Sequence, residues 1–250
     1  VWLARSGAPW RDLPERYGSW QTVYSRFRKW IDDGILDNIF RVLSLEAELE
    51  ELSIDASIVQ AHQHSAGAKK GAPNEIGHSR GGASTKIHAV VDAYGYPVYF
   101  MISEGQRNDI NYAIPLLDHI RIDGSKVLAD RGYDSNQLMD YIYDHGGEPT
   151  IPSRRGAKFD RRCDWWLYKE RHLVENYFLK LKAFRRIATR YDKLAFTYLG
   201  FLCIVSILIW LKEQLKMFFR HALVRCDSDG KLYLYDLVRT KKETSSPPEQ

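Results

Sequence analysis

From Leu52 onward the chain consists of short apolar runs bounded by Gly, Pro, Asn and Asp, which alternate with segments of helical periodicity. Short bounded runs predict strands, and their alternation with helices predicts an α/β fold with a mixed sheet. The length of 250 residues suits one large core, or a catalytic domain with a small appendage. With 44% hydrophobic and 27% charged residues, the composition is globular and excludes an intrinsically disordered chain.

The order of the expected elements narrows the fold class. We expect strands at 52–57, 86–92, 97–103, 126–129 and 148–151, a hairpin turn at 93–96, and helices at 109–120, 135–145 and 166–187. The resulting order, β-β-β-α-β-α-β-α, is that of RNase H-like folds, with a mixed sheet flanked by helices.

The N-terminal stretch predicts a small helical unit. Ser19 is placed as an N-cap, and the apolar residues that follow recur with helical spacing on one face: Trp20, Val23, Tyr24, Phe27 and Trp30. Gly34 ends this helix and a second apolar-periodic segment covers 35–45. Two helices separated by glycine fit either a helix-turn-helix-like DNA-binding unit or plain packing.

We therefore expect three parts. Residues 1–48 form the helical DNA-binding-like unit, residues 49–213 form the RNase H-like catalytic domain, and residues 214–250 form a polar, disordered tail. Because the chain begins at Val1 inside a patterned segment, we expect that some N-terminal sequence is missing.

Cysteine usage and charge point to an intracellular protein with a polyanionic partner. The three cysteines have no CxxC spacing, which excludes a disulfide framework and a thiolate zinc cage and favours the cytoplasm. The net charge is only +4, but residues 154–193 hold thirteen basic and five acidic residues. Residues 32–55 hold eight acids and one arginine. Local basic charge of this kind suits nucleic acid, although a solvated charged face is the simpler reading.

Residues 194–211 form an uncharged stretch of eighteen residues, which is long enough for a membrane-spanning helix. Polar interruptions within the stretch favour a buried core helix, so we expect no membrane partner.

The helix expected at 166–187 carries the most specific signal. Tyr168, Arg171, Glu175 and Lys182 follow one another at i, i+3, i+7 and i+14, within an arc of roughly 60° at about 100° per residue. An ordinary amphipathic helix with an Arg171–Glu175 ion pair explains this face. The alternative is a face that holds a metal ion against a phosphate backbone, with Glu175 as the oxygen ligand and the basic residues as phosphate clamps.

One carboxylate holds Mg²⁺ poorly, so a metal site needs partners. Asp55 lies within the first apolar strand, where an unpaired charge is costly. Asp130 lies at the end of the 126–129 strand, before Gly132. In an RNase H-like sheet these strands are neighbours and the last helix crosses them, so Asp55, Asp130 and Glu175 are expected to converge.

The helix contains Tyr-x2-Arg-x3-Glu-x6-Lys, and the chain resembles bacterial insertion-sequence transposases of the DDE, RNase H-like superfamily from about Trp2 to Lys212. The resemblance implies that Asp55, Asp130 and Glu175 form a catalytic triad binding two Mg²⁺ or Mn²⁺ ions. It implies a DNA transposase that binds terminal inverted repeats and performs metal-dependent strand cleavage and strand transfer.

The same resemblance implies the partners. Double-stranded DNA, as inverted repeats and as target, would be held by seven residues: Tyr168, Arg171, Lys182, Arg154, Arg155, Arg185 and Arg186. A homodimer in the bacterial cytoplasm, nucleoid-associated when bound to DNA, is implied because two element ends are cut together. The alternative function is a truncated, catalytically inactive transposase remnant that only binds DNA and represses transposition.

Overall fold

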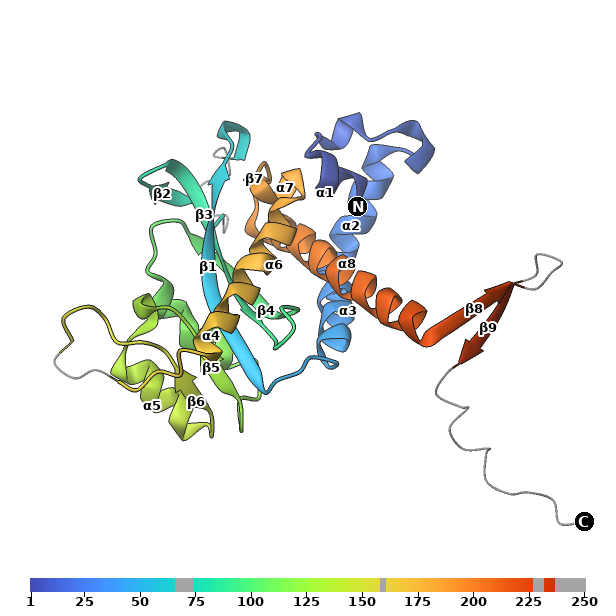
Figure 1. Ribbon diagram of the computed structural model, residues 1–250. Coiled ribbons are helices and arrows are strands. Elements are labelled where there is room, and N and C mark those ends of the chain that lie inside the picture. The colour runs from blue at the N-terminus through green and yellow to red at the C-terminus, as the bar shows by residue number, and fades with distance from the viewer. Residues whose placement is uncertain (66–73, 158–160, 227–231, 237–250) are drawn as a thin grey trace, which may run out of the picture. The chain divides into compact units, whose positions relative to one another are not determined.

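The computed structural model describes residues 1–65, 74–157, 161–226 and 232–236 (Figure 1). It divides into two compact units, Val1–Ile207 and Leu208–Gln250. The first unit contains both the N-terminal helices and the sheet.

The first unit is built on a seven-stranded mixed sheet with the order β2-β3-β1-β5-β6, in which β4 pairs with β3 and β7 pairs with β1. The antiparallel strands are β2 (Gly77–Ser79), β3 (Gly82–Val91) and β4 (Pro97–Glu104), which lie on one side of the long strand β1 (Glu51–Ala61). The strands parallel to β1 are β5 (Lys126–Leu128) and the short β7 (Thr189–Arg190), and β6 (Glu148–Thr150) lies parallel to β5. This mixed sheet with flanking helices confirms the predicted α/β, RNase H-like fold class.

The helices of this unit follow the sequence patterns, but their first and last residues differ from those that the sequence predicts. The α-helices are α1 (Trp2–Ser6), α2 (Trp20–Asp32), α3 (Ile35–Ser44), α4 (Ala113–Leu117), α5 (Asn136–Asp144), α6 (His172–Lys182), α7 (Arg185–Ala188) and the start of α8 (Ala195–His221). The 3-10 helices are η1 (Trp10–Asp12), η2 (Glu15–Tyr17), η3 (Gln63–Ser65), η4 (Asp109–Tyr112), η5 (Arg131–Tyr133) and η6 (Leu167–Arg171).

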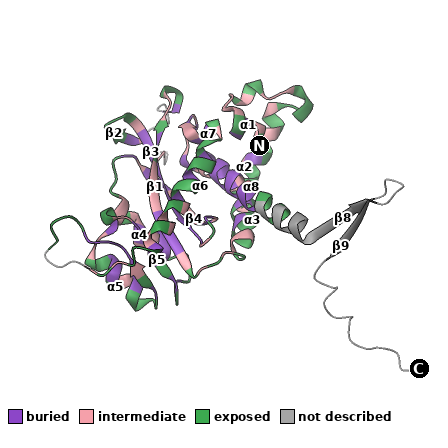
Figure 2. Ribbon diagram, viewed as in Figure 1, coloured by how far each residue is buried: buried purple, intermediate pink, exposed green. Residues whose placement is uncertain are grey.

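The two faces of β1 serve different purposes because successive side chains point to opposite sides of a strand. Leu52 and Ile54 are fully buried in the core cluster formed with α4 and α5. Asp55 and Ser57 contact side chains of η6 and α6. Figure 2 shows buried residues gathered on the central strands and on the first half of α8. The acidic residue thus lies on a strand whose opposite face is anchored in the core.

The N-terminal helices begin and end where the sequence predicts. Ser19 precedes α2, and Gly34 separates α2 from α3 with a φ of 67°, a left-handed conformation that favours glycine. Phe27 of α2 packs against Phe201 of α8, with ring centroids 4.8 Å apart, and Trp10 packs on both rings. The helical segment is therefore packed against α8 within the unit that also holds the sheet.

Several predicted limits were wrong. The helix expected at 166–187 is divided into η6, α6 and α7. The break between α6 and α7 lies at Phe184, which takes extended backbone angles (φ −95°, ψ 112°) that a helix does not continue. The helix expected at 109–120 is a 3-10 turn followed by a short α4, and its N-cap is Asn108 rather than Asp109. Strand β1 extends to Ala61, four residues beyond its expected end, because β3 and β7 both pair with its last residues.

Helix α8 covers the apolar stretch. Within the described residues one window, Ala195–Lys212, is long and apolar enough to cross a membrane by length and composition. Of this window 67% is buried inside the structure, which favours the core-helix interpretation.

The second unit contains the end of α8 and two antiparallel strands, β8 (Ala222–Cys226) and β9 (Leu232–Asp236). Part of the tail that was expected to be disordered is therefore strand, which agrees with the alternating Leu and Tyr residues of β9. The end of the expected tail, 237–250, lies outside the described residues.

Candidate functional site

The candidate site begins with Asp55, which β1 presents toward η6 and α6. Its Oδ2 accepts a hydrogen bond from Arg171 Nη1 at 2.9 Å, and its Oδ1 accepts one from the Ala56 amide at 2.8 Å. The Asp55 side chain is 21% exposed, so the carboxylate is largely removed from water but still reachable. A carboxylate in this setting needs a cationic partner, and Arg171 supplies it.

Arg171 joins two carboxylates from separate elements. While Nη1 binds Asp55, Nη2 donates to Glu175 Oε1 at 2.5 Å, one turn further along the chain. The guanidinium thus bridges the central strand and helix α6. The i, i+4 ion pair expected of an ordinary amphipathic helix is present, but it is half of a larger arrangement that includes Asp55.

The predicted helix face is preserved although the helix itself is shorter. Tyr168 and Arg171 lie on η6, and Glu175 and Lys182 lie on α6. Val174, Tyr177 and Leu181 are fully buried on the other side of α6. The burial of that side orients Glu175 and Lys182 toward the exposed face, where Lys182 Nζ donates to Ser57 Oγ at 2.7 Å.

Asp130 lies at the start of the turn that follows β5. The last pairs between the parallel strands are Leu52 with Val127 and Ser53 with Leu128, so Asp55 and Asp130 each come two residues after the paired end. Asp130 Oδ1 accepts the Gly132 amide at 2.8 Å and caps η5. The turn that the sequence motif predicts is therefore present, and Asp130 has the position expected of a strand-end carboxylate.

The electrostatics link these three carboxylates. Burial raises the pKa of Asp55 above its ordinary value; the Ala56 amide and Arg171 lower it, while the charges of Asp130 and Glu175 raise it further. Burial lowers the pKa of Arg171, but Asp55 and Glu175 together raise it above its usual range. Asp130 and Glu175 therefore both act on Asp55, and Asp55 and Glu175 share one guanidinium.

A buried phenol lies beside the same carboxylates. Tyr133 is 1% exposed and its hydroxyl has no hydrogen-bond partner among the described residues. Burial raises the pKa of Tyr133, and the charges of Asp109, Asp55 and Asp130 raise it further. An orphaned buried hydroxyl near several carboxylates is a donor set suited to a hydrated divalent cation. Sequence reasoning missed Tyr133, and the signal available was an aromatic residue directly after the Asp130 turn.

The carboxylates interact through their charges, but they are not arranged as the ligands of one metal ion. Among the residues that the structure describes, no group of three or more His, Cys, Asp or Glu side chains is arranged to hold a metal ion. The structure brings Asp55 and Glu175 together through Arg171, whereas Asp130 interacts with Asp55 only through its charge. Arg171 is the counterion of Asp55 and Glu175 in this arrangement.

An aromatic pair extends the site beyond Arg171. The Tyr168 ring lies 6.0 Å from the Arg171 guanidinium and packs edge-on against Trp165, with centroids 5.6 Å apart. Trp165 and Trp166 are 54% and 75% exposed. The Asp164 carboxylate accepts the amides of Trp166 and Leu167 and so fixes this turn. The adjacent tryptophans were visible in the sequence but were not selected.

The predicted DNA-contacting arginines fall into two classes. Arg154, Arg155 and Arg185 are exposed, and Arg154 also donates to the Gly132 carbonyl beside Asp130 at 3.1 Å. Arg186 is 3% exposed, and its guanidinium binds both oxygens of Asp192, at 3.0 and 2.8 Å. This burial contradicts the prediction that Arg186 contacts DNA, because its guanidinium donates to acceptors within the protein.

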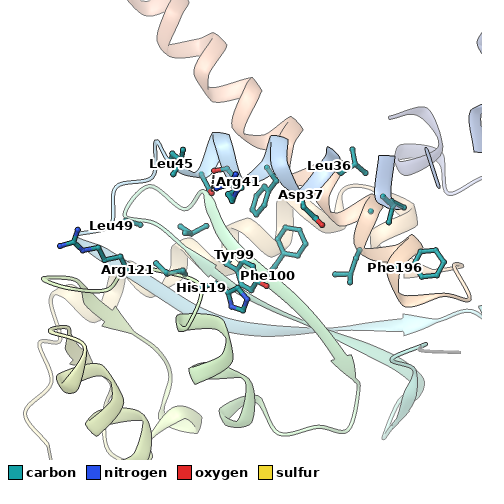
Figure 3. Close-up of a pocket in the computed structure, with 17 residues that line it drawn as sticks. Leu36, Asp37, Arg41, Leu45, Leu49, Tyr99, Phe100, His119, Arg121 and Phe196 are labelled. Atoms are coloured by element: carbon teal, nitrogen blue, oxygen red, sulfur yellow. Dashed lines mark hydrogen bonds between the residues drawn. The ribbon is translucent and has the colours of Figure 1, made fainter. Parts of the chain in front are cut away.

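A separate pocket of about 690 Å³ lies between α3, β4 and the start of α8. Figure 3 shows Asp37, Arg41 and His119 among mostly apolar side chains that line it. Its lining residues include none of the three carboxylates. The candidate site is therefore distinct from this pocket.

Comparison with known proteins assigns the family. Residues 46–210 match the family described as "Transposase DDE domain", and residues 1–40 match "Putative transposase of IS4/5 family". The first match covers most of the chain and includes all three carboxylates.

Three curated relatives are similar to this chain, and two of them are named as putative transposases. An "Uncharacterized protein y4sN" of Sinorhizobium fredii is 54% identical over 70 residues, which are 28% of this chain and 56% of that protein. A "Putative transposase for insertion sequence element IS6501" of Brucella ovis is 37% identical over 52% of this chain and 99% of its own length. The corresponding protein of IS402 from Burkholderia cepacia is 34% identical, over 54% of this chain and 66% of that protein.

Solved structures show more distant similarity. The Mos1 transposase paired-end complex is 14% identical, covering 84% of this chain and 75% of that chain with a TM-score of 0.30. A piggyBac transposase synaptic complex is 16% identical, covering 44% of this chain and 24% of that chain with a TM-score of 0.32.

Proposed function

The chain belongs to the Transposase DDE domain family, and on this premise we propose that it cleaves and joins DNA at the ends of an insertion sequence. The observation that carries the proposal is the Arg171 guanidinium held between Asp55 of the central strand and Glu175 of α6. Two carboxylates converge there from distant parts of the sequence and share one cation, which is the charge pattern of a site for divalent metal and phosphate.

The residues present fit a divalent metal. Asp55, Asp130 and Glu175 would hold Mg²⁺ or Mn²⁺, two ions in all, since they offer hard oxygen ligands. Burial raises the pKa of Asp55, and the charges of Asp130 and Glu175 raise it further. The bound metal would supply activation of the attacking hydroxyl and stabilisation of the leaving oxygen. The orphaned Tyr133 hydroxyl supports the fit, because it is buried within reach of the charges of Asp109, Asp55 and Asp130.

The chain's own basic residues would bind and orient the DNA backbone. Arg171 and Lys182 lie on the carboxylate face, and the guanidinium of Arg171, which donates one hydrogen bond to each of two carboxylates, would present the same two donors to a phosphate. Tyr168, backed by Trp165, provides an aromatic surface for a sugar or base. Arg154, Arg155 and Arg185 would follow the phosphate backbone and contribute affinity rather than sequence reading.

The DNA partners are double-stranded terminal inverted repeats and target DNA, bound in the bacterial cytoplasm. The N-terminal helical segment 1–48 is proposed to contribute to end recognition. A homodimer is proposed because two ends have to be cut together, and light scattering of the protein with and without end DNA measures it.

The test is cleavage and strand transfer on a labelled duplex carrying the host element's terminal repeat, with Mg²⁺ or Mn²⁺. Glu175→Gln is expected to lose cleavage and keep DNA binding, because it removes the charged ligand without changing the side-chain shape. Glu170→Gln, a neighbouring glutamate on η6, is the matched control and is expected to cleave normally.

The outcomes separate two functions. Metal-dependent nicking that is lost only in Glu175→Gln supports the transposase. Cleavage by Glu175→Gln at the wild-type rate contradicts it. Binding without cleavage by every protein, including the wild type, identifies a catalytically inactive DNA-binding remnant instead.

A further inference from the structure

Two side-chain contacts join strand β1 to the η6–α6 segment, and the second includes Ser57, which lies outside the predicted motif. The first is the Asp55–Arg171 ion pair. The second is the hydrogen bond from Lys182 Nζ to Ser57 Oγ, at 2.7 Å. Ser57 follows Asp55 by two residues and therefore points to the same face of the strand. The strand thus presents a carboxylate and a hydroxyl side by side to the helix.

The Lys182 ammonium is hydrogen-bonded to this hydroxyl. Within the described part of the chain no carboxylate lies at ion-pair distance from its ammonium group. A lysine side chain is a point charge on a flexible four-carbon stem, so an unanchored ammonium samples many positions. Lys182 is exposed, and partial burial nevertheless lowers its pKa.

The geometry leaves both partners able to bind a third group. An ammonium has three donors and only one is directed to Ser57 Oγ. The serine oxygen accepts from lysine and keeps its own proton for donation. A phosphate oxygen placed beside the Asp55–Glu175 carboxylates would therefore meet a fixed ammonium rather than a mobile one.

We propose that Ser57 is a positioning residue that holds the Lys182 ammonium in register with the carboxylate site for a DNA phosphate. This inference rests on the proposed function for the identity of the phosphate, but not for the contact itself. Ser57 acts through Lys182, so removing Ser57 should matter only while Lys182 is present.

The first measurement needs no DNA and no metal. The rate of amine labelling at Lys182 is followed by mass spectrometry in wild type, Ser57→Ala and Ser57→Thr. Labelling should speed up by about tenfold in Ser57→Ala, since a hydrogen bond to a charged donor is lost, and should stay near wild type in Ser57→Thr, which keeps the hydroxyl. Lys180 on the same helix is the internal control, and a general loosening of α6 would raise its labelling too.

The second measurement is cleavage of end DNA. Ser57→Ala should lower kcat by about tenfold with little change in KM, since misplacement weakens transition-state contacts more than overall binding. Ser57→Thr should restore the rate, and Ser44→Ala on α3 should cleave as wild type. In a Lys182→Met background Ser57→Ala should have no further effect.

The two measurements separate the two ideas. Faster Lys182 labelling in Ser57→Ala, together with no cleavage by wild type, retains the contact and rejects the proposed function. Wild-type cleavage that is unchanged in Ser57→Ala, or reduced equally with and without Lys182, overturns the positioning role. Equal labelling of Lys182 in wild type and Ser57→Ala also overturns it.

Discussion

Two arginine–carboxylate clusters lie fifteen residues apart in the chain and have opposite settings. At the candidate site, the side chains of Arg171, Asp55 and Glu175 are 20%, 21% and 52% exposed. In the second cluster, Arg186 and Asp192 are each 4% exposed. The same kind of ion pair is therefore accessible to solvent and substrate at the candidate site, which we call the open cluster, and is inaccessible in the second cluster, which we call the closed cluster. An ion pair is informative about function only when its burial is known.

The closed cluster ties separate segments together. Besides binding Asp192, Arg186 donates through Nη1 to the Ala8 carbonyl at 2.8 Å and lies over the Phe201 ring at 4.5 Å. Arg190 is fully buried beside it and donates to the carbonyls of Asn74 and Glu75. These contacts connect the N-terminal segment, α7 and the sheet.

The largest expected effect comes from the closed cluster. Arg186→Gln should lower the free energy of unfolding by about 3 to 5 kcal/mol, because it leaves Asp192 buried and unpaired. Urea denaturation followed by circular dichroism measures the change. Arg186→Lys keeps the charge and should recover part of the loss, and a loss below 1 kcal/mol in Arg186→Gln would contradict the closed setting.

The same substitution in the open cluster should affect chemistry more than stability. Arg171→Gln is expected to reduce cleavage by about a hundredfold, because one transition-state donor is removed. Its free energy of unfolding should change by about 1 kcal/mol, since the pair is only partly buried. Comparable destabilisation by Arg171→Gln and Arg186→Gln would remove the distinction between the two clusters.

A smaller effect separates neighbouring arginines within the basic segment. Arg185 is exposed, so Arg185→Gln should reduce the slope of log affinity for DNA against log salt by about 0.9. Titrations at several salt concentrations give this slope. Arg121→Gln, an exposed arginine next to the α3–β4 pocket, is the control and should leave the slope unchanged. Equal slopes for all three proteins would exclude Arg185 from the DNA surface.

The smallest expected effect is on the stability of the folded protein at Asp55, where the substitution is expected to stabilise the fold instead of destabilising it. Because the folded-state pKa of Asp55 is raised, the folded protein binds that proton more tightly than the unfolded chain. Stability from this group is present below its ordinary pKa of about 3.9 and is lost as the pH rises through the folded value. Asp55→Asn should therefore melt at a higher temperature than wild type at neutral pH.

Comparison of the two proteins at several pH values is the control for this effect. The advantage of Asp55→Asn should shrink as the pH falls toward the ordinary aspartate pKa, where the wild-type side chain is also neutral. Calorimetry at several pH values follows the difference. A lower melting temperature for Asp55→Asn at neutral pH would show that Arg171 stabilises the fold by more than the burial of Asp55 destabilises it.

The sheet was predictable because its hydrophobic pattern is local. The hairpin at 93–96 joins β3 and β4 as expected, and Asp55 stands out as a charge within an apolar strand. The limits of the helices were harder to predict, since Phe184 takes an extended conformation although no Gly or Pro lies beside it in the sequence. Spacing along α6 was informative because one helical period decides which residues share a face.

The burial of individual charged residues could not be predicted from the sequence of the basic segment. Arg185 and Arg186 are adjacent and identical, yet one is exposed and the other is buried against Asp192. Local sequence contains no signal for this difference, because Ala8 and Phe201 approach Arg186 from distant parts of the chain. Ser57 was missed for a similar reason, since its partner Lys182 is 125 residues away.

The junction between η6 and α6 divides the candidate site into parts of unequal stiffness. Tyr168 and Arg171 belong to a 3-10 segment, whose hydrogen bonds have poorer geometry, while Glu175 and Lys182 belong to a regular helix buried along one side. Amide hydrogen exchange should accordingly be fast over η6 and slow over α6 and β1. The guanidinium can then be released by a local opening of one turn, while the glutamate and the aspartate keep their places.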